Sequence, residues 1–312
     1  MVQHYFSLEG VYLQHTWLTI GSFDGVHLGH QQLIRELNRC AHAAQAKSVV
    51  LTFHPHPSVI LRNRRDAFYL TTSSEKLILL DELGTDFVII HPFTYEISQS
   101  SAREFVSYLF DHLAFDQLWV GSDFALGKGR EGNVDFLKQL GDELNYQVHV
   151  IEPITSGGQT ISSSYIRKLL TAGLVDEAGR LLGRPYQVAG EVIHGDGRGK
   201  SMGIPTANLD TGDEKLIPAA GVYACRAQIG GIYWPAAVNI GTRPTFENAD
   251  HRSIVEAHIL DYSAELYAQQ ITLEFISRLR GEEKFESVDE LIEQVHKDID
   301  QTRAIFARIQ NQ

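Results

Sequence analysis

The chain has 312 residues, with 43% hydrophobic and 21% charged side chains, a composition typical of soluble globular proteins. Its net charge of −12 argues against broad nucleic-acid binding, because neutralising a phosphate backbone requires a basic surface. Two cysteines and no C-x-x-C pair argue against a disulfide scaffold and a thiolate zinc site. No apolar run approaches the roughly 18 residues of a membrane span, and the N-terminus lacks a signal-peptide pattern, so we expect a cytoplasmic protein without membrane contact.

The first half alternates short apolar strands with amphipathic helices. The first strand, residues 17–20, leads through a glycine-rich loop into a helix. The apolar positions at helical spacing on that helix are Leu33, Ile34, Leu37, Ala41 and Ala44. Further strands are predicted at 48–53, 86–93, 117–124 and 146–153, and further helices at 75–84, 102–113 and 134–144. This alternation predicts βαβ units, a mainly parallel sheet and ligand binding at the carboxyl ends of the strands.

Two short helices, residues 162–173 and 174–183, end at Gly183, and Pro185 follows just beyond. A glycine followed by a proline is a strong helix stop. We therefore predict two domains, residues 1–183 and 184–312. Two domains also agree with the length, because single hydrophobic cores stop growing near ~250–300 residues.

The second half consists of short strands separated by glycine, proline and asparagine, which predicts an antiparallel barrel. The strands are expected at residues 187–195, 221–230, 232–241, 253–261 and 270–280. A final helix is expected over 287–309, where Ser287 and Glu290 have the spacing of a capping box. Its apolar stripe predicts packing on the barrel. The stripe contains Val288, Leu291, Ile292, Val295, Ile299 and Phe306.

The loop after the first strand, GSFDGVHLGH at residues 21–30, contains two histidines three residues apart. Its glycines allow a sharp turn, and the helix that follows offers free N–H groups and a partial positive charge. His27 and His30 can face one side of the first helical turn, an arrangement that suits a triphosphate. A metal site would need a third ligand, which His54 or His56 could supply. A turn without any ligand is the third alternative.

A second candidate site lies within GDGRGKSMGIPTANL at residues 195–209. The glycines with Arg198 and Lys200 indicate either a flexible phosphate loop or a hairpin turn, and their spacing is not that of a Walker motif. Thr206 and Asn208 alternate, so they face one side of an extended segment. Their oxygens suit Mg²⁺ beside nucleotide phosphates, and a polar turn is the alternative.

Glu256 lies on a predicted strand, on the same face as Ile254 and His258. A glutamate facing a barrel core is costly unless it is paired or used, whereas an outward-facing glutamate is solvated. The pattern alone does not choose between the two faces.

Segments of both halves resemble, in order, the motifs of the bacterial bifunctional riboflavin kinase/FAD synthetase family. In the first half these are GSFDGVHLGH, TFHPHP, VGSDFALGKGREG and ISSSYIR. In the second half, GDGRGKSMGIPTAN, VNIGTRPTF and VEAHILDY resemble the riboflavin kinase signature. The resemblance implies an α/β Rossmann-like nucleotidylyltransferase domain with a parallel sheet, followed by an antiparallel β-barrel riboflavin kinase domain with a C-terminal helix.

The resemblance also implies the activity. The chain would phosphorylate riboflavin to FMN and adenylylate FMN to FAD, with ATP as donor and Mg²⁺ as cofactor. ATP, riboflavin, FMN and FAD are the expected partners, nucleic acid and membrane are not, and a homo-oligomer is left open.

For adenylyl transfer, the resemblance implies that His27 and His30 contact the phosphates of ATP. Asp123 and Arg130 would lie near the nucleotide or the flavin phosphate, and Asp24 would instead hold the loop in shape. For the ISSSYIR segment at residues 161–167, the alternative to ATP binding is a capped helix with a solvent-facing arginine. The implied ATP-binding residues are Gly21, Phe23, Gly25, His27, Gly29, His30, Ser162, Ser163, Ser164 and Arg167.

For the kinase, the resemblance makes Glu256 the catalytic base and Arg280 a flavin contact, for which a charged surface turn is the alternative. The residues implied to bind ATP phosphates are Gly195, Gly197, Gly199, Lys200, Thr206 and Asn208, with Mg²⁺ held through the last two.

Two positions depart from the family pattern. Leu126 stands where the family commonly carries an aromatic, and Ala268 replaces a glycine, so we expect a slightly different turn there. Both sets of motifs are complete, so we expect both activities. These two departures are the only sequence hints for the alternative that only one activity is retained and the other module is a flavin-binding or regulatory domain. A different nucleotidylyltransferase joined to an unrelated barrel is a further alternative.

Overall fold

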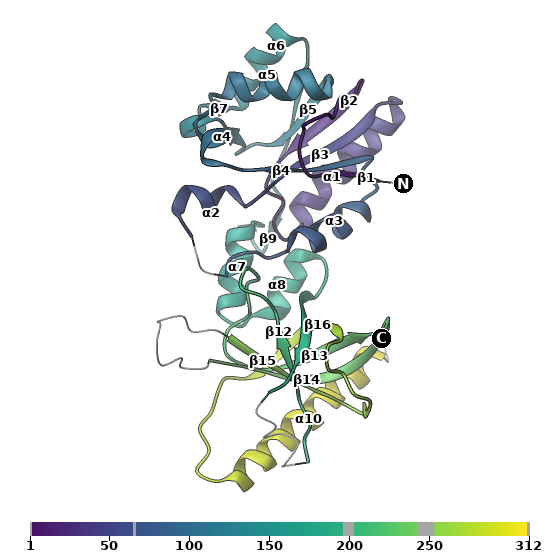
Figure 1. The fold of residues 1–312 in the computed structure, drawn as a ribbon, viewed down its shortest axis with the longest axis vertical. Helices are drawn as coiled ribbons and strands as arrows, with labels where there is room; N and C mark the ends of the chain where they lie inside the picture. Colours follow the sequence, from purple (N-terminus) through teal and green to yellow (C-terminus); the bar gives the residue numbers. More distant parts are fainter. Residues whose placement is uncertain (1, 65–66, 196–202, 243–252, 311–312) are drawn as a thin grey trace. The chain divides into compact units, whose positions relative to one another are not determined.

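The computed structural model describes residues 2–64, 67–195, 203–242 and 253–310. The chain forms two compact units, Met1–Ser163 and Ser164–Gln312. The first is an α/β unit and the second is a β-barrel with helices (Figure 1). The predicted fold class is confirmed. Within the described residues, no helix is both long and apolar enough to cross a membrane.

The first unit is built on a six-stranded sheet in the order β1-β4-β3-β2-β5-β8. All neighbouring strands are parallel. The chain moves outward from β2 through β3 to β4 and then returns to β5 on the other side of β2. Such a reversal is where open parallel sheets bind ligands, at the carboxyl ends of the strands. The strands are β1 (Gln3–Tyr5), β2 (Thr16–Ile20), β3 (Lys47–His54), β4 (Phe87–Pro92), β5 (Phe115–Gly121) and β8 (Gln147–Ile151).

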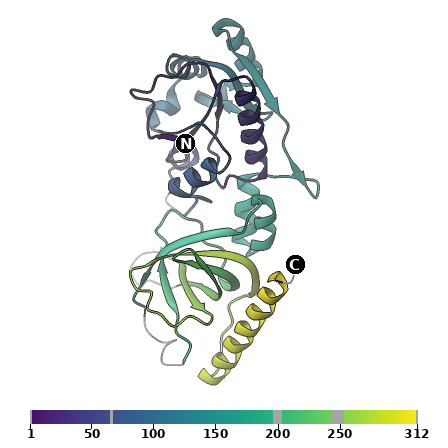
Figure 2. The same cartoon turned by 90° about the vertical axis from the view of Figure 1, so that its right-hand side faces the viewer.

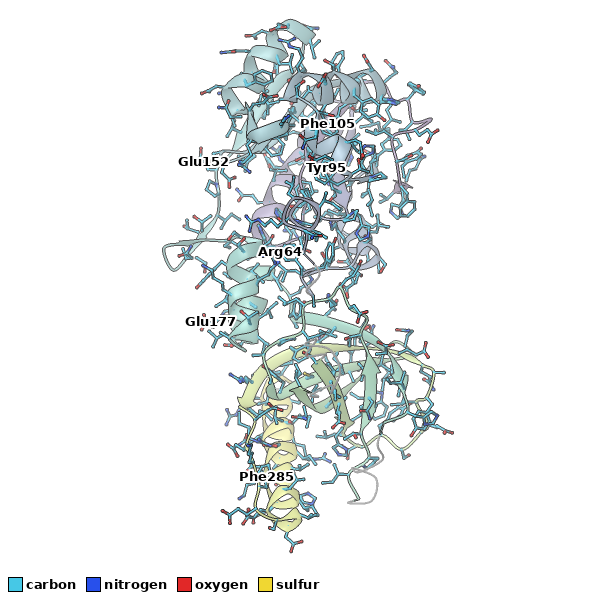
Figure 3. All side chains as sticks on the ribbon, turned by 60° about the vertical axis from the view of Figure 1, so that its left-hand side comes forward. Arg64, Tyr95, Phe105, Glu152, Glu177 and Phe285 are labelled. Carbon is cyan, nitrogen blue, oxygen red and sulfur yellow. The ribbon has the colours of Figure 1, made fainter. Side chains whose placement is uncertain are left out.

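Helices cover both faces of this sheet (Figure 2). α1 (Leu28–Ala43) and α3 (Ser73–Asp81) share one apolar cluster with β3 and β4. α5 (Ala102–Leu113) and α6 (Val134–Leu144) lie on the other face and have the predicted bounds. Phe105 of α5, labelled in Figure 3, packs against Phe53 of β3. Their ring centroids are 6.2 Å apart. Because both faces are covered, β3 is buried from residue 48 to residue 53, including the polar residues Ser48 and Thr52.

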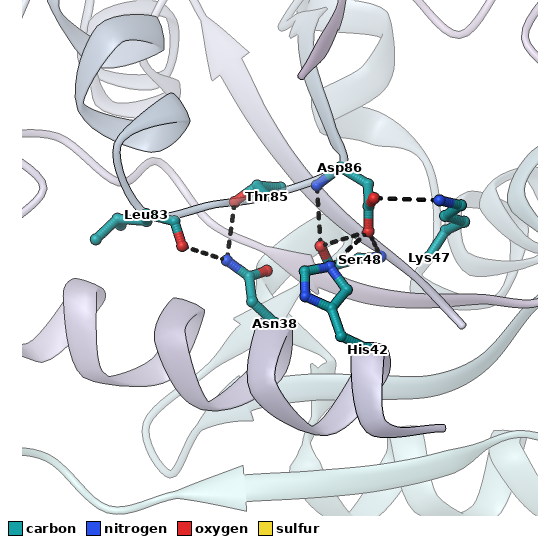
Figure 4. Close-up of polar contacts among 7 residues, drawn as sticks. All are labelled: Asn38, His42, Lys47, Ser48, Leu83, Thr85 and Asp86. Carbon is teal, nitrogen blue, oxygen red and sulfur yellow. Dashed lines mark hydrogen bonds and ion pairs between the residues drawn. The ribbon is translucent and has the colours of Figure 1, made fainter. Parts of the chain in front are cut away.

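A polar network fixes the C-terminal half of α1 to the starts of β3 and β4 (Figure 4). The carboxylate of Asp86 accepts hydrogen bonds from the Ser48 backbone N–H at 3.0 Å and from Lys47 Nζ at 3.3 Å, and pairs with His42 at 2.9 Å. Asn38 donates to the Leu83 carbonyl at 2.8 Å. α1 ends at Ala43, so Ala44, the last residue of the predicted stripe, lies beyond the helix and is exposed.

The remaining elements of the first unit are short and carry no periodic pattern, so the sequence did not predict them. They are α2 (Pro57–Arg62), α4 (Tyr95–Gln99), the 3-10 turn η1 (Lys128–Arg130), and two small hairpins. The hairpins are β6 (Ala125–Leu126) with β7 (Gly132–Asn133), and β9 (Thr155–Ser156) with β10 (Gln159–Thr160).

The second unit contains a closed antiparallel barrel in the order β11-β12-β15-β14-β13-β16. Five of its strands match predicted ones. The sixth, β12, is only four residues long and was expected as an extended segment. The strands are β11 (Tyr186–Ile193), β12 (Ala207–Asp210), β13 (Gly221–Ile229), β14 (Ile232–Thr242), β15 (Ser253–Ile259) and β16 (Gln270–Arg280).

Two helices precede the barrel, α7 (Ser163–Thr171) and α8 (Val175–Leu182). α8 ends at Gly183, whose φ of 73° is the left-handed cap that the Gly–x–Pro sequence indicates. α8 packs on β11 and β16, and Arg278 of β16 donates to the Ala172 carbonyl at 3.3 Å. α8, and α7 from Ser164 on, thus belong to the compact barrel unit. The division at residue 183 stays a prediction.

The C-terminal helix α10 (Val288–Gln310) packs on β13 and β14. Ser287 caps it by accepting the Glu290 N–H at 3.2 Å. The Glu290 carboxylate accepts from the Glu286 N–H at 3.1 Å, one residue upstream of the partner that a capping box requires. Of the predicted stripe, Phe306 is buried, whereas Val288 remains 60% exposed at the helix start.

Candidate active sites

The H-x-x-H loop lies at the reversal point of the parallel sheet, between β2 and α1. His27 is the N-cap of α1, and its Nδ1 accepts the backbone N–H of His30 at 3.4 Å. A neutral His27 ring therefore carries its proton on Nε2. The two rings are stacked, with centroids 3.6 Å apart and 18° between their planes. The structure brings both histidines to the helix start, as the phosphate interpretation requires.

His30 is held neutral by its surroundings. Burial lowers the pKa of His30 well below its usual 6.5, and positive charge on His27 and on Lys76 acts in the same direction. Among the described residues, its Nδ1 is buried without a hydrogen-bond partner. At neutral pH His30 can therefore offer one N–H and one lone pair, but no full charge.

Neither His54 nor His56 is placed as a third metal ligand beside His27 and His30 in the described part of the chain. His56 Nδ1 accepts the Ser58 N–H at 3.0 Å and caps α2. The His54 ring lies beside Tyr69, with centroids 5.7 Å apart. No group of three or more His, Cys, Asp or Glu able to hold a metal ion occurs among these residues.

Asp24 holds the glycine loop in shape. Its carboxylate is fully buried and accepts the Leu70 and Thr71 N–H groups, at 3.1 and 3.0 Å, and the Thr71 hydroxyl at 3.2 Å. The Thr71 hydroxyl oxygen in turn accepts the Gly25 N–H at 3.0 Å. The loop is thus fastened to the segment before α3.

The glycines of the loop make room for rings. A Cβ at Gly21 would lie 2.9 Å from the ring of Phe23, and one at Gly29 would lie 3.3 Å from the ring of His27. Phe23 is buried and packs edge-on against His30, with 5.1 Å between centroids. Gly25 has a φ of 81°, which favours glycine.

Within the first unit, the ISSSYIR segment is hydrogen-bonded to this loop. The Ser163 hydroxyl donates to the Asp24 carbonyl at 2.8 Å across 139 positions of sequence. Ser162 directly precedes it, whereas Ser164 and Arg167 lie on the part of α7 assigned to the second unit. The two motifs that the sequence separates are therefore neighbours at Ser163.

Asp123 and Arg130 lie together in the loop after β5, the strand that flanks the reversal point. Arg130 donates to the Asp123 carbonyl at 2.9 Å, and both side chains are exposed. Leu126, the first departure from the family, packs against the apolar cluster beneath α5 and α6.

In the barrel, Glu256 lies on the outer face of β15. Val255 and Ala257 are fully buried, whereas Glu256 is half-buried on the opposite face. Asn208 of β12 and Asn239 of β14 stand directly opposite Glu256 on the two neighbouring strands. Directly opposite side chains have Cβ atoms about 4.5–5.5 Å apart. The predicted base thus lies between two amide side chains.

Two further predicted residues join this face. Gly195 has no room for a side chain, because a Cβ there would collide with the Asn208 amide. Thr206 directly precedes β12, and the His258 ring N–H at Nδ1 donates to the carbonyl of Pro205 at 2.8 Å. Gly197, Gly199 and Lys200 lie outside the described residues.

Arg280, the expected flavin contact, is engaged by a residue that the sequence did not single out. Its Nε and Nη2 donate to the buried carboxylate of Asp298 at 3.1 and 2.8 Å, and Gln294 donates to the same carboxylate at 3.0 Å. The guanidinium also lies 5.7 Å from the ring centroid of Phe285, the residue labelled in Figure 3. A flavin contact by Arg280 stays a prediction.

A second residue was also missed. Lys76 on α3 is only 3% exposed, with its ammonium against the H-x-x-H loop. In each case the sequence carries one sign that a charged residue lies on a buried helix face. Lys76 shares a helix face with buried Leu80. Asp298 follows Leu291 and Val295 at helical spacing.

Known proteins show the same two-part organisation. A family model described as FAD synthetase matches residues 11–165, and one described as riboflavin kinase matches residues 182–306. The chain is 37% identical over 295 residues to the bifunctional riboflavin kinase/FMN adenylyltransferase of Listeria monocytogenes, covering 94% of this chain and 93% of that one. It is 36% identical over 291 residues to the protein of the same name from Escherichia coli strain K12, covering 93% and 92%.

A crystal structure named Macrolide-efflux Protein, from Streptococcus pneumoniae, is also similar. It has a TM-score of 0.88 and 28% identity, covering 97% of this chain and 98% of that one. Matching models on both halves and relatives above 35% identity over nearly the whole length lead to one assignment. The chain belongs to the bifunctional riboflavin kinase/FMN adenylyltransferase family.

Proposed function

We propose that this chain phosphorylates riboflavin to FMN in its barrel unit and adenylylates FMN to FAD through the H-x-x-H loop, with ATP as donor in both steps. One observation carries the proposal: in each unit, residues of separate motifs lie together. Ser163 binds the loop at Asp24, and Glu256 stands opposite Asn208. These contacts support placing adenylyl transfer at the H-x-x-H loop and the kinase reaction at Glu256.

In the adenylyl transfer, a phosphate oxygen of FMN attacks the α-phosphorus of ATP, a P–O–P bond forms and pyrophosphate leaves. The nucleophile is already an anion, so the step needs positioning and charge neutralisation rather than a strong base. His27 and His30 would donate to the phosphates from the start of α1, whose free N–H groups favour anions. Ser162, Ser164 and Arg167 would bind the polyphosphate as the resemblance implies.

In the kinase step, Glu256 would accept the proton of the riboflavin 5′-hydroxyl as its oxygen attacks the γ-phosphorus of ATP, and ADP leaves. The half-buried outer face of β15 leaves Glu256 accessible to a substrate. Thr206 and Asn208 would hold Mg²⁺, since a hydroxyl and an amide oxygen are donors that this ion prefers. When bound, Mg²⁺ supplies charge neutralisation on the phosphates.

The test is incubation of the full chain with riboflavin, ATP and Mg²⁺, followed by chromatography of the flavins. The expected result is FMN first and FAD later. Supplied FMN should give FAD and pyrophosphate without any riboflavin. Recovery of FMN alone would refute the adenylyl-transfer half and favour the alternative of one active module. A cytoplasmic location stays a prediction from the sequence, which leaves a homo-oligomer open.

A further inference from the structure

Lys76 lies in the interior of the first unit. Its side chain is only 3% exposed, and it is the fourth residue of α3. Lysine is almost never buried to this degree unless it is paired, because its ammonium loses hydration. Neither the fold nor the roles given above to the motif residues account for it.

The contacts of Lys76 are to the H-x-x-H loop. Its Nζ donates to the Ser22 carbonyl at 2.7 Å and to the Thr52 hydroxyl at 3.2 Å. Thr52 donates to the same Ser22 carbonyl at 3.0 Å. An ammonium has three donors, and these two are its only hydrogen-bond partners among the described residues. The charge is therefore attached to the loop backbone rather than neutralised by a carboxylate in direct contact.

The charge of Lys76 acts on the start of α1. After burial and the charge of His27, positive charge on Lys76 is the third cause that lowers the pKa of His30. Among the described residues, the charged and titratable groups that face it are Asp24 from the loop and His30, stacked on His27, from α1. β3 contributes only the hydroxyl of Thr52, and Glu75, its neighbour on α3, is occupied in capping at Thr72.

We propose that Lys76 is a positioning residue for adenylyl transfer, whose ammonium fixes the Ser22 carbonyl and supplies buried positive charge beneath the triphosphate of ATP. By holding this carbonyl inward, it turns the following N–H groups and both histidines toward the phosphates. Because the charge is buried, it acts on the phosphates with little screening by solvent. The inference rests on the proposed function and adds a residue to it that carries no family motif.

A consequence is a pH dependence specific to one of the two reactions. Burial lowers the pKa of Lys76 from 10.5 to about 8, although Asp24 opposes the shift. Above that pH the amine becomes neutral and the loop loses its charge. Bound ATP favours the charged ammonium, so Lys76 loses its proton near this pH only in the free enzyme. The resulting loss of activity therefore appears in kcat/KM for ATP. In kcat, which reports the complex, it is displaced to higher pH.

The experiment measures conversion of FMN to FAD by the full chain between pH 6.5 and 10, with phosphorylation of riboflavin recorded on the same samples. We expect kcat/KM for ATP in adenylyl transfer to be about tenfold lower at pH 9 than on its plateau. Free phosphate groups titrate near pH 6, so the substrates do not produce this loss. A profile that stays flat from pH 7 to 9.5 would overturn the proposal without any variant.

Variants give the second readout. Lys76→Met should lower adenylylation about 10- to 100-fold at pH 7 and abolish the alkaline loss, while riboflavin phosphorylation stays unchanged. Lys76→Arg keeps the charge at all these pH values, so its residual activity should show no decline near pH 8. Lys138→Met, the same change on the exposed surface of α6, is the control and should alter neither reaction.

The outcomes separate the two claims. Wild-type adenylylation in a folded Lys76→Met chain, or an unchanged alkaline loss in it, would overturn the role of Lys76 while leaving the proposed function intact. A wild-type chain that forms no FAD at any pH would overturn both.

Discussion

Ala268 allows a quantitative test of how this chain accommodates its second departure from the family. The residue lies in the turn before β16, with a φ of 59° in the left-handed region. Its N–H donates to the Val192 carbonyl at 2.9 Å, and the Val192 N–H donates to the Gln269 carbonyl at the same distance. The turn is therefore fastened to the end of β11, and the alanine adopts a backbone conformation that favours glycine.

The cost of that conformation can be estimated. A residue with a Cβ loses about 1–2 kcal/mol in the left-handed region, whereas glycine costs about 0.5–1 kcal/mol through the greater freedom of its unfolded chain. Ala268→Gly should therefore stabilise the barrel unit by about 0.5–1 kcal/mol. For a unit of this size, that raises its melting temperature by about 1–4 °C.

Scanning calorimetry of the full chain measures this change. The control is Ala264→Gly, an exposed alanine that is absent from the positive-φ positions, which should lose about 0.4–1 kcal/mol instead. The KM for ATP in the kinase reaction should stay unchanged in Ala268→Gly, because the turn keeps its shape. An equal or lower melting temperature in Ala268→Gly than in wild type would refute the reasoning.

Three further substitutions test the remaining roles. His30→Ala should slow FAD formation about 10- to 100-fold and leave FMN formation intact, measured by flavin chromatography; loss of both activities would contradict a role confined to one reaction. Glu256→Gln should reduce FMN formation at least about 100-fold while supplied FMN is still converted to FAD, and unchanged kinase turnover would rule out the base assignment. Asp298→Asn removes the buried carboxylate partner of Arg280 and leaves the exposed Glu283 at 3.9 Å, so it should destabilise the barrel unit by about 3 kcal/mol in urea unfolding. A change below about 0.5 kcal/mol, the size of an ordinary surface substitution, would show that the pair is not structural.

Most of the fold was predictable because its signals are periodic. The helix over 102–113 and the helix over 134–144 have the predicted bounds, since their apolar positions and end signals agree. β12 could not be recognised as a strand, because its apolar–polar alternation covers only four residues and two of them, Asn208 and Asp210, are of types that are depleted in strands. Its place in the barrel comes from pairing with β11 and β15, which only the three-dimensional structure reveals.

Site residues that belong to a sequence motif could be predicted. Residues whose role depends on a contact with a distant part of the chain could not. The sequence correctly placed Glu256 and Val255 on opposite faces of β15. Only the structure shows that Val255 faces the core, so that Glu256 lies on the outer face. Lys76 and Asp298 depend on partners 54 and 18 positions away, the Ser22 carbonyl and Arg280. No local propensity encodes such pairs.

The sheet of the first unit has unpaired edge strands, whereas the barrel of the second unit has none among the described residues. The barrel closes on itself, so in the described part of the chain its strands all have neighbours on both sides. The sheet of the first unit is open and ends at β1, only three residues long, and at β8, with five. Unpaired strand edges are where chains add to one another during aggregation, and short edges reduce that hazard. If heated chains associate through strands, the open sheet of the first unit, and β8 in particular, is the expected place.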